Sequence, residues 1–453
     1  MLLEVIILAA GKGTRMRSEL PKVLHPLAGK PMLVHVVEQA LRLKPSRTQI
    51  IVGHGADQVA AVVQPLGAEC VTQAQQLGTG HAVAQAMPGV DDNAIVLVLY
   101  GDVPLVPAAL MQQLADQAAH GDLAILTVTL DDSSGYGRIV RNETGHIQAI
   151  VEQKDASPAQ LAIKEINTGI LAAKASLLNG WLPRIKNHNA QGEIYLTDIV
   201  AMAADDGINI CHFQPHFPQQ TQGVNDRVQL ADLERWHQRQ LGDQLLRDGV
   251  QLADPGRFDL RGQLTAGKDV YIDINVIIEG QVTLGDGVHI GPNCHIKNAN
   301  IGTGSKVLAN SVIDEAQVAA HCQVGPFARL RPGTILHDHA KVGNFVETKN
   351  TTVGQGSKAN HFTYLGDTVV GEKVNIGAGT ITCNYDGVNK FKTTIDDGAF
   401  IGSNSSLVAP VNIGAGATIG AGSTITKDVP DENLAIARGK QHNLATWAKP
   451  IKI

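Results

Sequence analysis

The sequence predicts two folded parts, an α/β domain with a mostly parallel sheet followed by a parallel β-helix. Two observations support this prediction. Apolar runs typical of buried strands alternate with helix-like segments over the first 225 residues. Aliphatic residues then recur every six positions through most of the remaining chain. A chain of 453 residues is also too long for one ordinary core, so more than one domain is expected.

The amino-terminal half alternates strands and helices. Segments 31–43 and 107–119 carry apolar residues at three-to-four spacing, which indicates amphipathic helices. Such alternation favours a parallel sheet covered by helices. Ligands of these sheets bind at the carboxyl ends of strands, where the loop 8–22 and "YGD" (100–102) fall. The runs that we interpret as buried strands are 4–8, 49–53, 94–100 and 123–130.

The loop "LAAGKGTRMRSELPK" (8–22) combines two glycines with four cations. Glycine lets backbone N–H groups approach an anion closely, and Lys12, Arg15 and Lys22 supply positive charge. The dinucleotide-binding and P-loop patterns both need glycine at position 16, where the chain has Met16. We therefore expect a phosphate-binding loop of another type.

A linker helix is predicted between the two parts. Over residues 225–249 apolar side chains mark one face of a segment that is otherwise rich in Gln, Arg and Asp. We predict a first domain at 1–225, a linker helix at 226–249, and a β-helix domain with a carboxyl-terminal tail at 250–453. The residues of the apolar face are Val228, Leu230, Leu233, Trp236, Leu241 and Leu245.

The carboxyl-terminal half carries a six-residue repeat. Such a unit is too short for a helical repeat and suits a short strand plus a turn, with one aliphatic side chain pointing inward each time. The period breaks near 331–350 and 377–394, which predicts loops that leave the stack there. The repeating positions are Phe258, Leu264, Val270, Val276, Val282, Val288 and Cys294; Ile301, Val307 and Ile313; Val312, Val318, Val324 and Leu330; and Ile395, Ile401, Leu407, Ile413, Ile419 and Ile425.

Composition excludes several functional classes. A net charge of −6 argues against nucleic acid or a polybasic membrane surface as a partner. The five cysteines include no C-x-x-C pair, which disfavours a disulfide framework or a zinc cage and fits a reducing cytoplasm. No 18-residue apolar run and no basic leader occur, so we expect a cytoplasmic protein without a membrane anchor.

Short motifs along the whole chain resemble a known family. "LAAGKGTRM…PK", "QLGTGHA" (76–82), "YGDVPL" (100–105), "GYGRI" (135–139), "VEQKDA" (151–156), "EINTGI" (165–170) and "GVNDR" (223–227) resemble the sugar-1-phosphate nucleotidyltransferases. With the hexapeptide part and "NHFTYLGD" (360–367), the chain is similar to the bacterial family of bifunctional N-acetylglucosamine-1-phosphate uridyltransferases/glucosamine-1-phosphate acetyltransferases. The resemblance implies a Rossmann-like nucleotidyltransferase domain and a left-handed β-helix, although parallel crossovers in general are right-handed.

The first implied reaction is attack of N-acetylglucosamine-1-phosphate on the α-phosphorus of UTP, with loss of pyrophosphate. Positioning and charge neutralisation dominate such a transfer. By resemblance Lys22 neutralises phosphate, Arg15 assists, and Asp102 and Asn225 hold Mg²⁺, which takes its other ligands from water and phosphate. The other implied nucleotide-sugar positions are Leu8, Ala9, Ala10 and Gly11 around the nucleotide, Gln73, Gly78 and Thr79 at the uracil, Tyr100 and Gly101 beside Asp102, and Gly137, Glu152 and Asn167 at the sugar.

The second implied reaction moves an acetyl group from acetyl-CoA to the amine of glucosamine-1-phosphate. An ammonium has no lone pair, so a base must first remove a proton, and a histidine titrates in the right range. The resemblance gives this role to His361. It matches Arg331 and Lys349 to the sugar phosphate and Tyr364 and Asn375 to the sugar. The matches to acetyl-CoA are Ala378, Asn384, Tyr385, Ser403, Ala421 and Arg438.

Three alternatives need weighing. Cys383 could act as a nucleophile, but its sequence neighbours include Asp386 and no group that promotes a thiolate, so we interpret it as structural. A single-activity nucleotidyltransferase with a regulatory β-helix is disfavoured by the His361 segment. A non-enzymatic scaffold is disfavoured by Lys22, Asp102 and Asn225.

Assembly is the last expectation. One β-helix is a thin prism with little surface on which to enclose a large cofactor, and related hexapeptide acyltransferases use clefts between neighbouring copies. We therefore expect a homotrimer whose partners are its small-molecule substrates.

Overall fold

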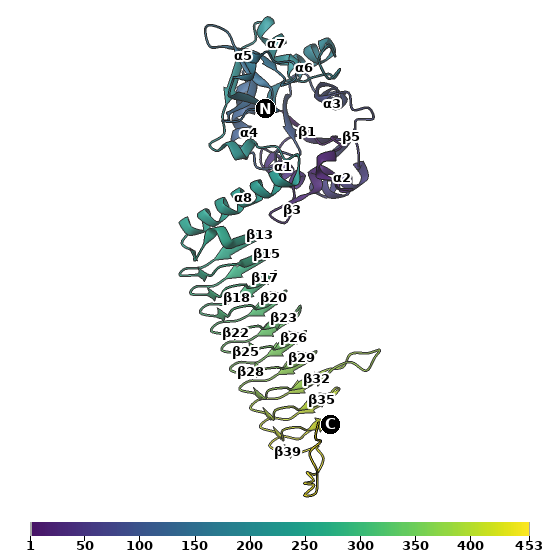
Figure 1. Ribbon diagram of the computed structural model, residues 1–453, viewed down its shortest axis with the longest axis vertical. Helices are drawn as coiled ribbons and strands as arrows, with labels where there is room; N and C mark the ends of the chain where they lie inside the picture. Colours follow the sequence, from purple (N-terminus) through teal and green to yellow (C-terminus); the bar gives the residue numbers. More distant parts are fainter. Residues whose placement is uncertain (1, 453) are drawn as a thin grey trace. The chain divides into compact units, whose positions relative to one another are not determined.

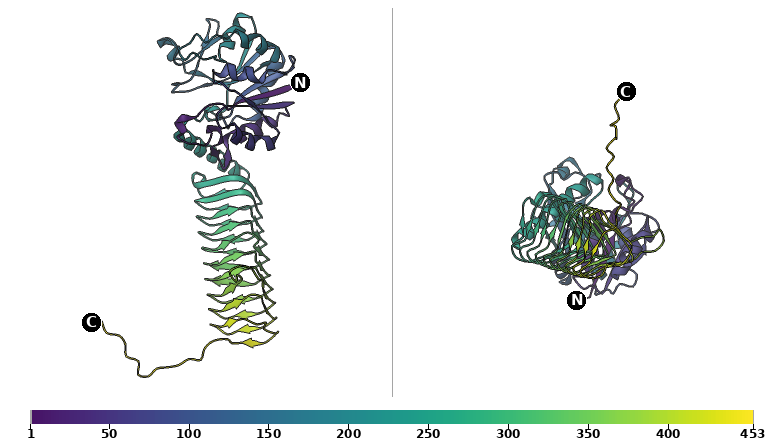
Figure 2. Two further views of the ribbon diagram at one scale, coloured as in Figure 1. Left: turned by 90° about the vertical axis from the view of Figure 1, so that its right-hand side faces the viewer. Right: turned by 90° about the horizontal axis from the view of Figure 1, so that it is seen from below.

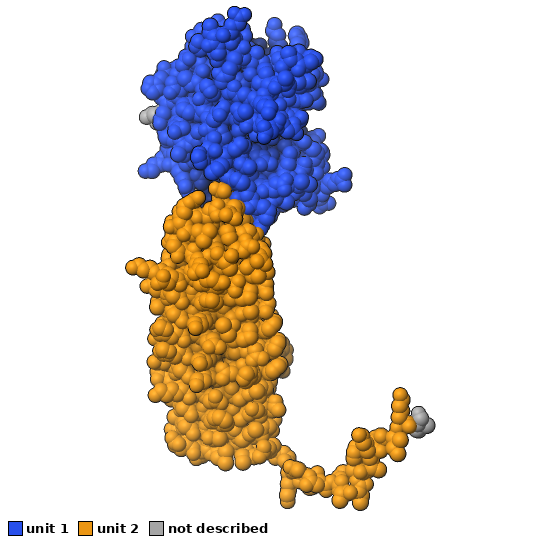
Figure 3. Space-filling model, turned by 60° about the vertical axis from the view of Figure 1, so that its left-hand side comes forward, with its two compact units in different colours: residues 1–236 blue, residues 237–453 orange. Residues whose placement is uncertain are grey.

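The computed structural model describes residues 2–452 and divides into two compact units, residues 1–236 and 237–453 (Figure 3). The first unit has a nine-stranded sheet (Figure 1). Its main path is β11 (Ile210–Phe213), β7 (Leu123–Thr129), β10 (Glu165–Lys174), β6 (Ile95–Tyr100), β1 (Leu3–Leu8), β4 (Arg47–Val52) and β5 (Glu69–Thr72). Off this path, β8 (Arg138–Arg141) pairs with β10, and β9 (Ile147–Val151) pairs with β8.

The sheet is mostly parallel, as the sequence predicts. β1 pairs in parallel with β4 and β6, and all four predicted strands are present. β10, which the sequence analysis did not identify as a strand, runs antiparallel between β6 and β7. The carboxyl ends of β1 and β6 meet at one edge of the sheet, followed by the turns η1 (Thr14–Met16) and η2 (Lys22–Leu24) and by the segment after Tyr100.

Helices cover both faces of this sheet. Alternate side chains of β1 point to opposite faces, so Val5 and Ile7 join one apolar core while Ile6 and Leu8 join another. The first core includes residues of α1 (Met32–Leu41), α2 (Ala56–Val63) and α4 (Ala108–Ala119). The second includes residues of α3 (Thr79–Ala86), α6 (Ala175–Trp181) and α7 (Asp198–Asp205). Shorter elements are β2 (Pro26–Leu27), β3 (Lys30–Pro31) and α5 (Pro158–Leu161).

The second unit is a parallel β-helix, and this prediction is confirmed. Tyr271 pairs with His289 and His289 with Lys306, so one coil takes 17 or 18 residues (Figure 2). Within residues 2–452 one sheet has eleven strands: β12 (Gln251–Leu252), β14 (Tyr271–Ile272), β16 (His289–Ile290), β19 (Lys306–Val307), β22 (Gln323–Val324), β25 (Lys341–Asn344), β28 (Lys358–His361), β31 (Asn375–Ile376), β34 (Phe400–Ile401), β37 (Thr418–Ile419) and β39 (Leu434–Ala435).

A second sheet forms the other sides of the coils. All its ladders are parallel. The left-handed winding of the β-helix stays a prediction. Its strands are β13 (Phe258–Ala266), β15 (Val276–Leu284), β17 (His295–Lys297), β18 (Asn300–Ile301), β20 (Val312–Asp314), β21 (Gln317–Val318), β23 (Arg329–Leu330), β24 (Ile335–Leu336), β26 (Glu347–Lys349), β27 (Thr352–Val353), β29 (Tyr364–Gly366), β30 (Thr368–Val370), β32 (Ile381–Cys383), β33 (Thr393–Ile395), β35 (Ser406–Val408), β36 (Val411–Ile413) and β38 (Thr424–Ile425). After β39 the chain leaves the stack as an extended tail (Figure 2).

The core of the β-helix is built from paired inward positions. Val307, Ile313 and Leu407 are fully buried, and so are the small residues two positions before them, among them Ser311 and Ser405. The prediction that Val312 points inward is wrong. Val312 is 39% exposed because it neighbours Ile313 on one strand, where successive side chains point to opposite faces.

The predicted loop at 331–350 is absent. Arg329 pairs with Glu347 on the next coil, so the chain makes an ordinary turn of the stack there. The apolar period is interrupted because Thr348 occupies a fully buried position, where its hydroxyl lies 3.0 Å from that of Thr334. A polar residue at an inward position therefore interrupts the apolar pattern, which is why the sequence predicts an inserted loop there.

The second predicted interruption, at 377–394, does contain an excursion. Asn375 pairs with Phe400, a step of 25 residues instead of 17 or 18. The extra residues form a hairpin-like loop closed by a bridge between Tyr385 and Lys390, which projects from the stack near β32 (Figure 1). At its tip Asp386 accepts hydrogen bonds from the backbone of Val388 and Asn389.

The predicted linker segment forms one helix, α8 (Arg227–Arg247). Leu233 and Trp236 pack with apolar residues of the first unit, and Leu241 and Leu245 pack against the β-helix core. Val228 does not belong to the packed face, because it is 70% exposed. Among residues 2–452 we find no helix that is both long and apolar enough to cross a membrane.

Two candidate active sites

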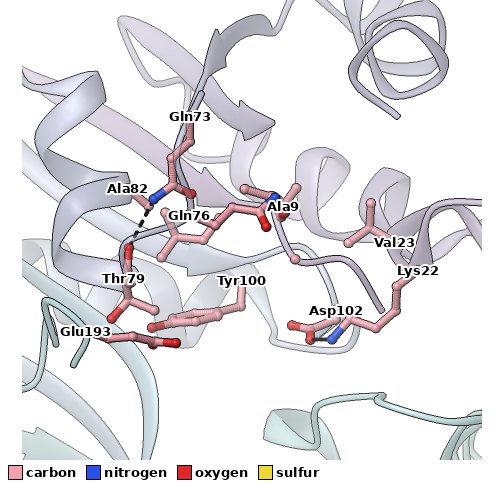
Figure 4. Close-up of a pocket in the computed structure, with 14 residues that line it drawn as sticks. Ala9, Lys22, Val23, Gln73, Gln76, Thr79, Ala82, Tyr100, Asp102 and Glu193 are labelled. Atoms are coloured by element: carbon pink, nitrogen blue, oxygen red, sulfur yellow. Dashed lines mark hydrogen bonds and ion pairs between the residues drawn. The ribbon is translucent and has the colours of Figure 1, made fainter. Parts of the chain in front are cut away.

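The first unit holds a cavity of about 240 Å³ at the carboxyl ends of β1 and β6 (Figure 4). Most residues predicted around the nucleotide line it, and Gln76 and Glu193 are lining residues that sequence reasoning missed. Gln76 donates to the carbonyl of Ala10 over 2.8 Å. The full lining is Leu8, Ala9, Ala10, Gly11, Lys22, Val23, Gln73, Gln76, Gly78, Thr79, Ala82, Tyr100, Asp102 and Glu193.

Predicted phosphate and metal residues converge at one end of this cavity. The ammonium of Lys22 donates to Oδ2 of Asp102 and, over 3.2 Å, to Oδ1 of Asn225. Arg15 donates to the same Asn225 oxygen over 3.1 Å. The backbone N–H of Val224 bonds to the carbonyl of Asp102 over 2.9 Å, which joins the two segments. Side chains from three distant parts of the sequence therefore meet at one point.

Gly13 has a packing role in this loop. Its φ of +59° suits glycine, and a Cβ built there would lie 2.6 Å from the Cβ of Lys22. Gly13 thus allows Lys22 to pass close to the loop. Above Gly11, by contrast, nothing lies within 4 Å of such a Cβ, so the backbone there is open to a ligand.

The donor set suits a hard divalent cation. Asp102 and Asn225 turn a carboxylate and an amide oxygen toward one cationic centre, which the Lys22 ammonium now occupies. Such oxygens are the ligands that Mg²⁺ prefers. No group of three or more His, Cys, Asp or Glu residues suited to a metal occurs in the part of the chain described, 2–452. A cation here would complete its shell with water and ligand oxygens.

The opposite end of the cavity is formed by Gln73 and the segment that begins α3. Gly78 has a φ of +117°, and a Cβ there would lie 2.5 Å from the carbonyl oxygen of Ile194. The 194–196 segment holds this turn, since Leu196 donates to the hydroxyl of Thr79 over 3.0 Å and Gly80 to the carbonyl of Ile194 over 2.9 Å. Only glycine fits position 78 without moving that segment.

The residues predicted for the sugar lie together beside Tyr100. Asn167 donates its backbone N–H to the carbonyl of Gly137 over 2.9 Å, and a Cβ on Gly137 would lie 3.3 Å from Oε1 of Glu152. Thr197 donates to that same oxygen over 3.1 Å. Burial, followed by the charges of nearby acidic groups, raises the pKa of Glu152. Gly137, Glu152, Asn167 and Gly101 do not line the cavity itself, and neither do Arg15 and Asn225, which contact its lining residue Lys22 or each other.

Tyr100 lies between the cavity and this sugar group. A Cβ on Gly169 would lie 2.5 Å from the Tyr100 ring, so Gly169 leaves the space that the ring fills. Burial raises the pKa of Tyr100, and the charges of Glu152 and Asp102 raise it further. The phenol therefore keeps its proton and can donate a hydrogen bond at neutral pH.

In the second unit His361 ends β28 on an exposed corner of the stack. Its Nδ1 lies 2.6 Å from Oδ1 of Asn344, one coil earlier in register. With that amide oxygen as partner, Nδ1 carries the imidazole proton and Nε2 keeps a lone pair. The sequence analysis did not identify Asn344, whose role is evident only from the stacking of the two coils.

Three other predicted residues continue the position of His361 along the same corner. The N–H of Gly379 bonds to the carbonyl of His361, that of Asn404 to Ala378, and that of Gly422 to Ser403. Arg438 donates to the carbonyl of Ala421 over 2.8 Å. We name this row the His361 column: it comprises His361, Ala378, Ser403 and Ala421.

A cationic group lies on the neighbouring side of the coils. The Lys390 ammonium lies close to that of Lys349 and lowers its pKa, with Asp367 opposing. Arg331 bonds to Glu347 over 2.8 Å. Lys390 comes from the projecting loop and was missed, because nothing in the sequence pairs the loop with Lys349.

Of the other predicted residues, Tyr364 and Asn384 lie on the same side of the coils as this cationic group, and Asn375 lies on the other sheet. A Cβ on Gly366 would lie 2.5 Å from the Tyr364 hydroxyl and 2.8 Å from the amide of Asn384, so both side chains pack over this glycine. Asn375 is on the eleven-stranded sheet and Tyr364 on the other, on opposite sides of the corner. Each of the two sheets that meet near His361 therefore carries one of these predicted sugar residues. Tyr385 is 60% exposed on the loop.

The five cysteines are all free. Burial raises the pKa of Cys294 and of Cys322 to about 11, so both thiols stay protonated at neutral pH. Cys383 is half-buried on β32. No disulfide therefore links cysteines among residues 2–452.

Comparison with known proteins gives matches along the chain. Residues 5–165 match the MobA-like NTP transferase domain, 260–353 the GMPPB C-terminal domain, and 392–427 the bacterial transferase hexapeptide (six repeats). The chain is 58% identical over 450 residues to a bifunctional protein GlmU from Marinobacter nauticus, covering 99% of both chains. It is 58% identical over 451 residues to that of Cellvibrio japonicus and 55% over 452 residues to that of Stutzerimonas stutzeri, covering 100% of each.

Proposed function

The chain belongs to the family of bifunctional GlmU proteins, and from this premise we propose how its residues divide two reactions between them. It is an enzyme that makes UDP-N-acetylglucosamine. It acetylates glucosamine-1-phosphate with acetyl-CoA and then transfers UMP from UTP to N-acetylglucosamine-1-phosphate, releasing pyrophosphate. The single-activity alternative is disfavoured, because bifunctional relatives match over their whole length.

The observation that carries the uridylyl proposal is the convergence of Lys22, Arg15, Asp102 and Asn225 at one end of a cavity whose other end holds Gln73. We assign the triphosphate to the cationic end and the base to the Gln73 end. Mg²⁺ held by Asp102 and Asn225 would neutralise triphosphate charge when bound. Lys22 and Arg15 then hold the phosphate oxygens in line for attack.

The sugar phosphate enters beside Tyr100 in this proposal. The Glu152 carboxylate and the Asn167 amide supply acceptors and donors for sugar hydroxyls and the N-acetyl group, with Gly137 leaving the room for them. A sugar that lacks one of these groups would leave a buried polar atom unpaired, which disfavours its binding. Tyr100, which lines the nucleotide cavity and lies near Glu152, borders both substrates in this proposal.

The acetyl transfer centres on Nε2 of His361. It removes one proton from the substrate ammonium, which frees the nitrogen lone pair. The amine nitrogen then bonds to the thioester carbonyl carbon, and the carbon–sulfur bond breaks. The nitrogen gives up a second proton to become the amide, and the leaving thiolate takes up a proton to become the free thiol. Arg331, Lys349 and Lys390 bind the sugar phosphate. Asn344 holds the imidazole ring of His361 in place.

The cofactor lies along the His361 column. Consecutive coils are about 4.8 Å apart, so the column from His361 to Ala421 spans about 14 Å, which suits an extended molecule. The small side chains of Ala378, Ser403 and Ala421 leave its path open, and Arg438 lies at the far end. Tyr385 and Asn384 border it from the loop side.

Assembly as a homotrimer in the cytoplasm completes the proposal. The His361 column lies on an exposed corner of the stack, where a neighbouring copy would bring a second side to the cofactor. The free cysteines suit a reducing compartment. Sedimentation measurements at decreasing concentration, matched to both assays, would test this. Acetylation should fall as monomers form while uridylyl transfer persists, and a fully acetylating monomer would contradict the trimer.

The central experiment supplies the purified chain with glucosamine-1-phosphate, acetyl-CoA, UTP and Mg²⁺. UDP-N-acetylglucosamine should form, as measured by chromatography, together with pyrophosphate and a free thiol. Leaving out acetyl-CoA should stop the product unless N-acetylglucosamine-1-phosphate is added. No product from the acetylated substrate would reject the uridylyl proposal.

A further inference from the structure

Gln73 makes two contacts through one atom at the blind end of the nucleotide cavity. The residue follows β5 and is only 4% exposed. Its amide nitrogen lies 3.1 Å from the carbonyl oxygen of Gly78 and 3.0 Å from Nδ1 of His81. The dashed line at Gln73 in Figure 4 marks the first of these. The other end of the amide, Oε1, bonds to no donor among residues 2–452 and belongs to the cavity lining.

The identity of the two amide atoms follows from Gly78. A backbone carbonyl can only accept, so the atom that faces it must be the NH₂ group. The Gly78 carbonyl cannot turn away easily, because the 194–196 segment packs against this turn and holds Gly80 and Thr79. The Gln73 carbonyl oxygen is thereby directed into the cavity.

The state of His81 follows in turn. Since the Gln73 NH₂ group donates, Nδ1 of His81 accepts, and a neutral imidazole then carries its proton on Nε2. That nitrogen lies 3.3 Å from the amide of Gln85, one helical turn further along α3. The atom of Gln85 that faces it is the amide nitrogen Nε2, so the amide has to turn over for its oxygen to accept this N–H. The chain of partners runs from Gly78 through Gln73 and His81 to Gln85.

We propose that His81 is a positioning residue that makes Gln73 select uracil over cytosine. This rests on the proposed function, in which the base binds at Gln73. Uracil carries a hydrogen on N3 and can donate to Oε1, whereas N3 of cytosine is an acceptor and would face that oxygen unfavourably. An unrestrained glutamine could turn its amide over and donate to cytosine. His81 opposes this turn, because its proton would have to move from Nε2 to Nδ1 to meet the Gln73 oxygen, which would also face the Gly78 carbonyl.

The test compares UTP with CTP in three variants of the full chain. His81→Leu removes the acceptor, and the ratio of kcat/KM for UTP to that for CTP should fall about fivefold, as expected for one lost hydrogen bond. His81→Asn places an amide oxygen where Nδ1 stood and should restore the ratio. His120→Leu changes an exposed histidine outside the cavity and should leave the ratio at its original value.

The ratio separates positioning from damage. A distorted fold would slow both nucleotides equally, so an unchanged ratio in His81→Leu, or an equal fall in His120→Leu, would overturn the inference. A His81→Asn variant as unselective as His81→Leu would also overturn it. If the original chain uses neither nucleotide, the proposed function fails, and that result is distinguishable from a chain that uses UTP with a ratio insensitive to His81.

Discussion

The cavity of the first unit and the His361 column of the second hold their polar groups in different ways. In the cavity, Lys22, Asp102 and Asn225 come from distant segments and bond directly to one another. In the column, successive residues occupy the same position on successive coils and bond through the backbone. Loops that converge can build a complete site within one chain. A repeating coil sets a row of groups at a fixed spacing, and in our proposal a neighbouring copy completes the site.

This difference predicts that either reaction can be removed without the other. The largest effect is expected for His361→Ala, which should slow acetyl transfer roughly 10²–10⁴-fold because the ammonium loses its base. Uridylyl transfer from N-acetylglucosamine-1-phosphate should be unaffected. Separate assays of thiol release and pyrophosphate release would measure both.

Two variants serve as controls for this prediction. His339→Ala removes another exposed histidine of the stack and should retain acetylation. Cys383→Ser should also retain substantial activity, since direct transfer needs no thiol. Trapping an acetyl group on Cys383 would contradict direct transfer, and full acetylation by His361→Ala would exclude His361 as the base.

Asp102→Ala tests whether uridylyl transfer can be lost while acetyl transfer is kept. Loss of the carboxylate should lower uridylyl transfer roughly 10²–10³-fold, as does removal of other groups that stabilise developing charge. Acetyl transfer should remain near its original rate, as measured by the same thiol assay. Equal loss of both activities would instead indicate misfolding, which circular dichroism would detect.

Asn344 should have a smaller effect. Asn344→Leu removes the acceptor that holds Nδ1–H of His361, and acetyl transfer should fall about fivefold. Asn344→Asp keeps an acceptor and adds a negative charge, which raises the pKa of the imidazole. The acid limb of its kcat/KM profile should therefore move to higher pH. An unmoved limb in this variant would argue against contact between the two side chains in solution.

The smallest effect is expected from truncation. A chain that ends at residue 240 keeps Leu233 and Trp236, which pack with Leu27 and Met32. It should fold and transfer the uridylyl group at a rate within about twofold of the whole chain, because the cavity lining ends at Glu193 and Asn225 precedes the cut. Thermal unfolding and pyrophosphate release would measure this. A fragment without a cooperative transition would show that the first unit needs the β-helix to fold.

Sequence patterns predicted the strands around the sheet and the repeat of the β-helix because both depend on local periodicity. They erred where periodicity misleads. Thr348 is a polar residue at an inward position, where its hydroxyl contacts another hydroxyl, so a regular coil was predicted to be a loop. Val312 is apolar but exposed, and it was predicted to point inward in place of its neighbour Ile313. Motifs placed Lys22 and Asp102 near each other through a family resemblance, and the structure brings them into contact.

The residues that were missed share a different property. Gln76, Glu193, Asn344 and Lys390 reach their sites through contacts between segments far apart in the chain. Asn344 and His361 are 17 residues apart, one coil, and that spacing could have suggested the pair. Nothing comparable relates Lys390 to Lys349, because the loop that carries it follows no repeat.

The loop between Asn375 and Phe400 adds residues to one coil and yet leaves every ladder above and below it in register. The register of the strands therefore does not depend on the number of residues in the loop between them. A loop of other length or chemistry could replace it at this corner without a change in the strands of the β-helix. The phosphate contact that we propose for Lys390 on this loop could therefore be redesigned while the His361 column beside it is kept.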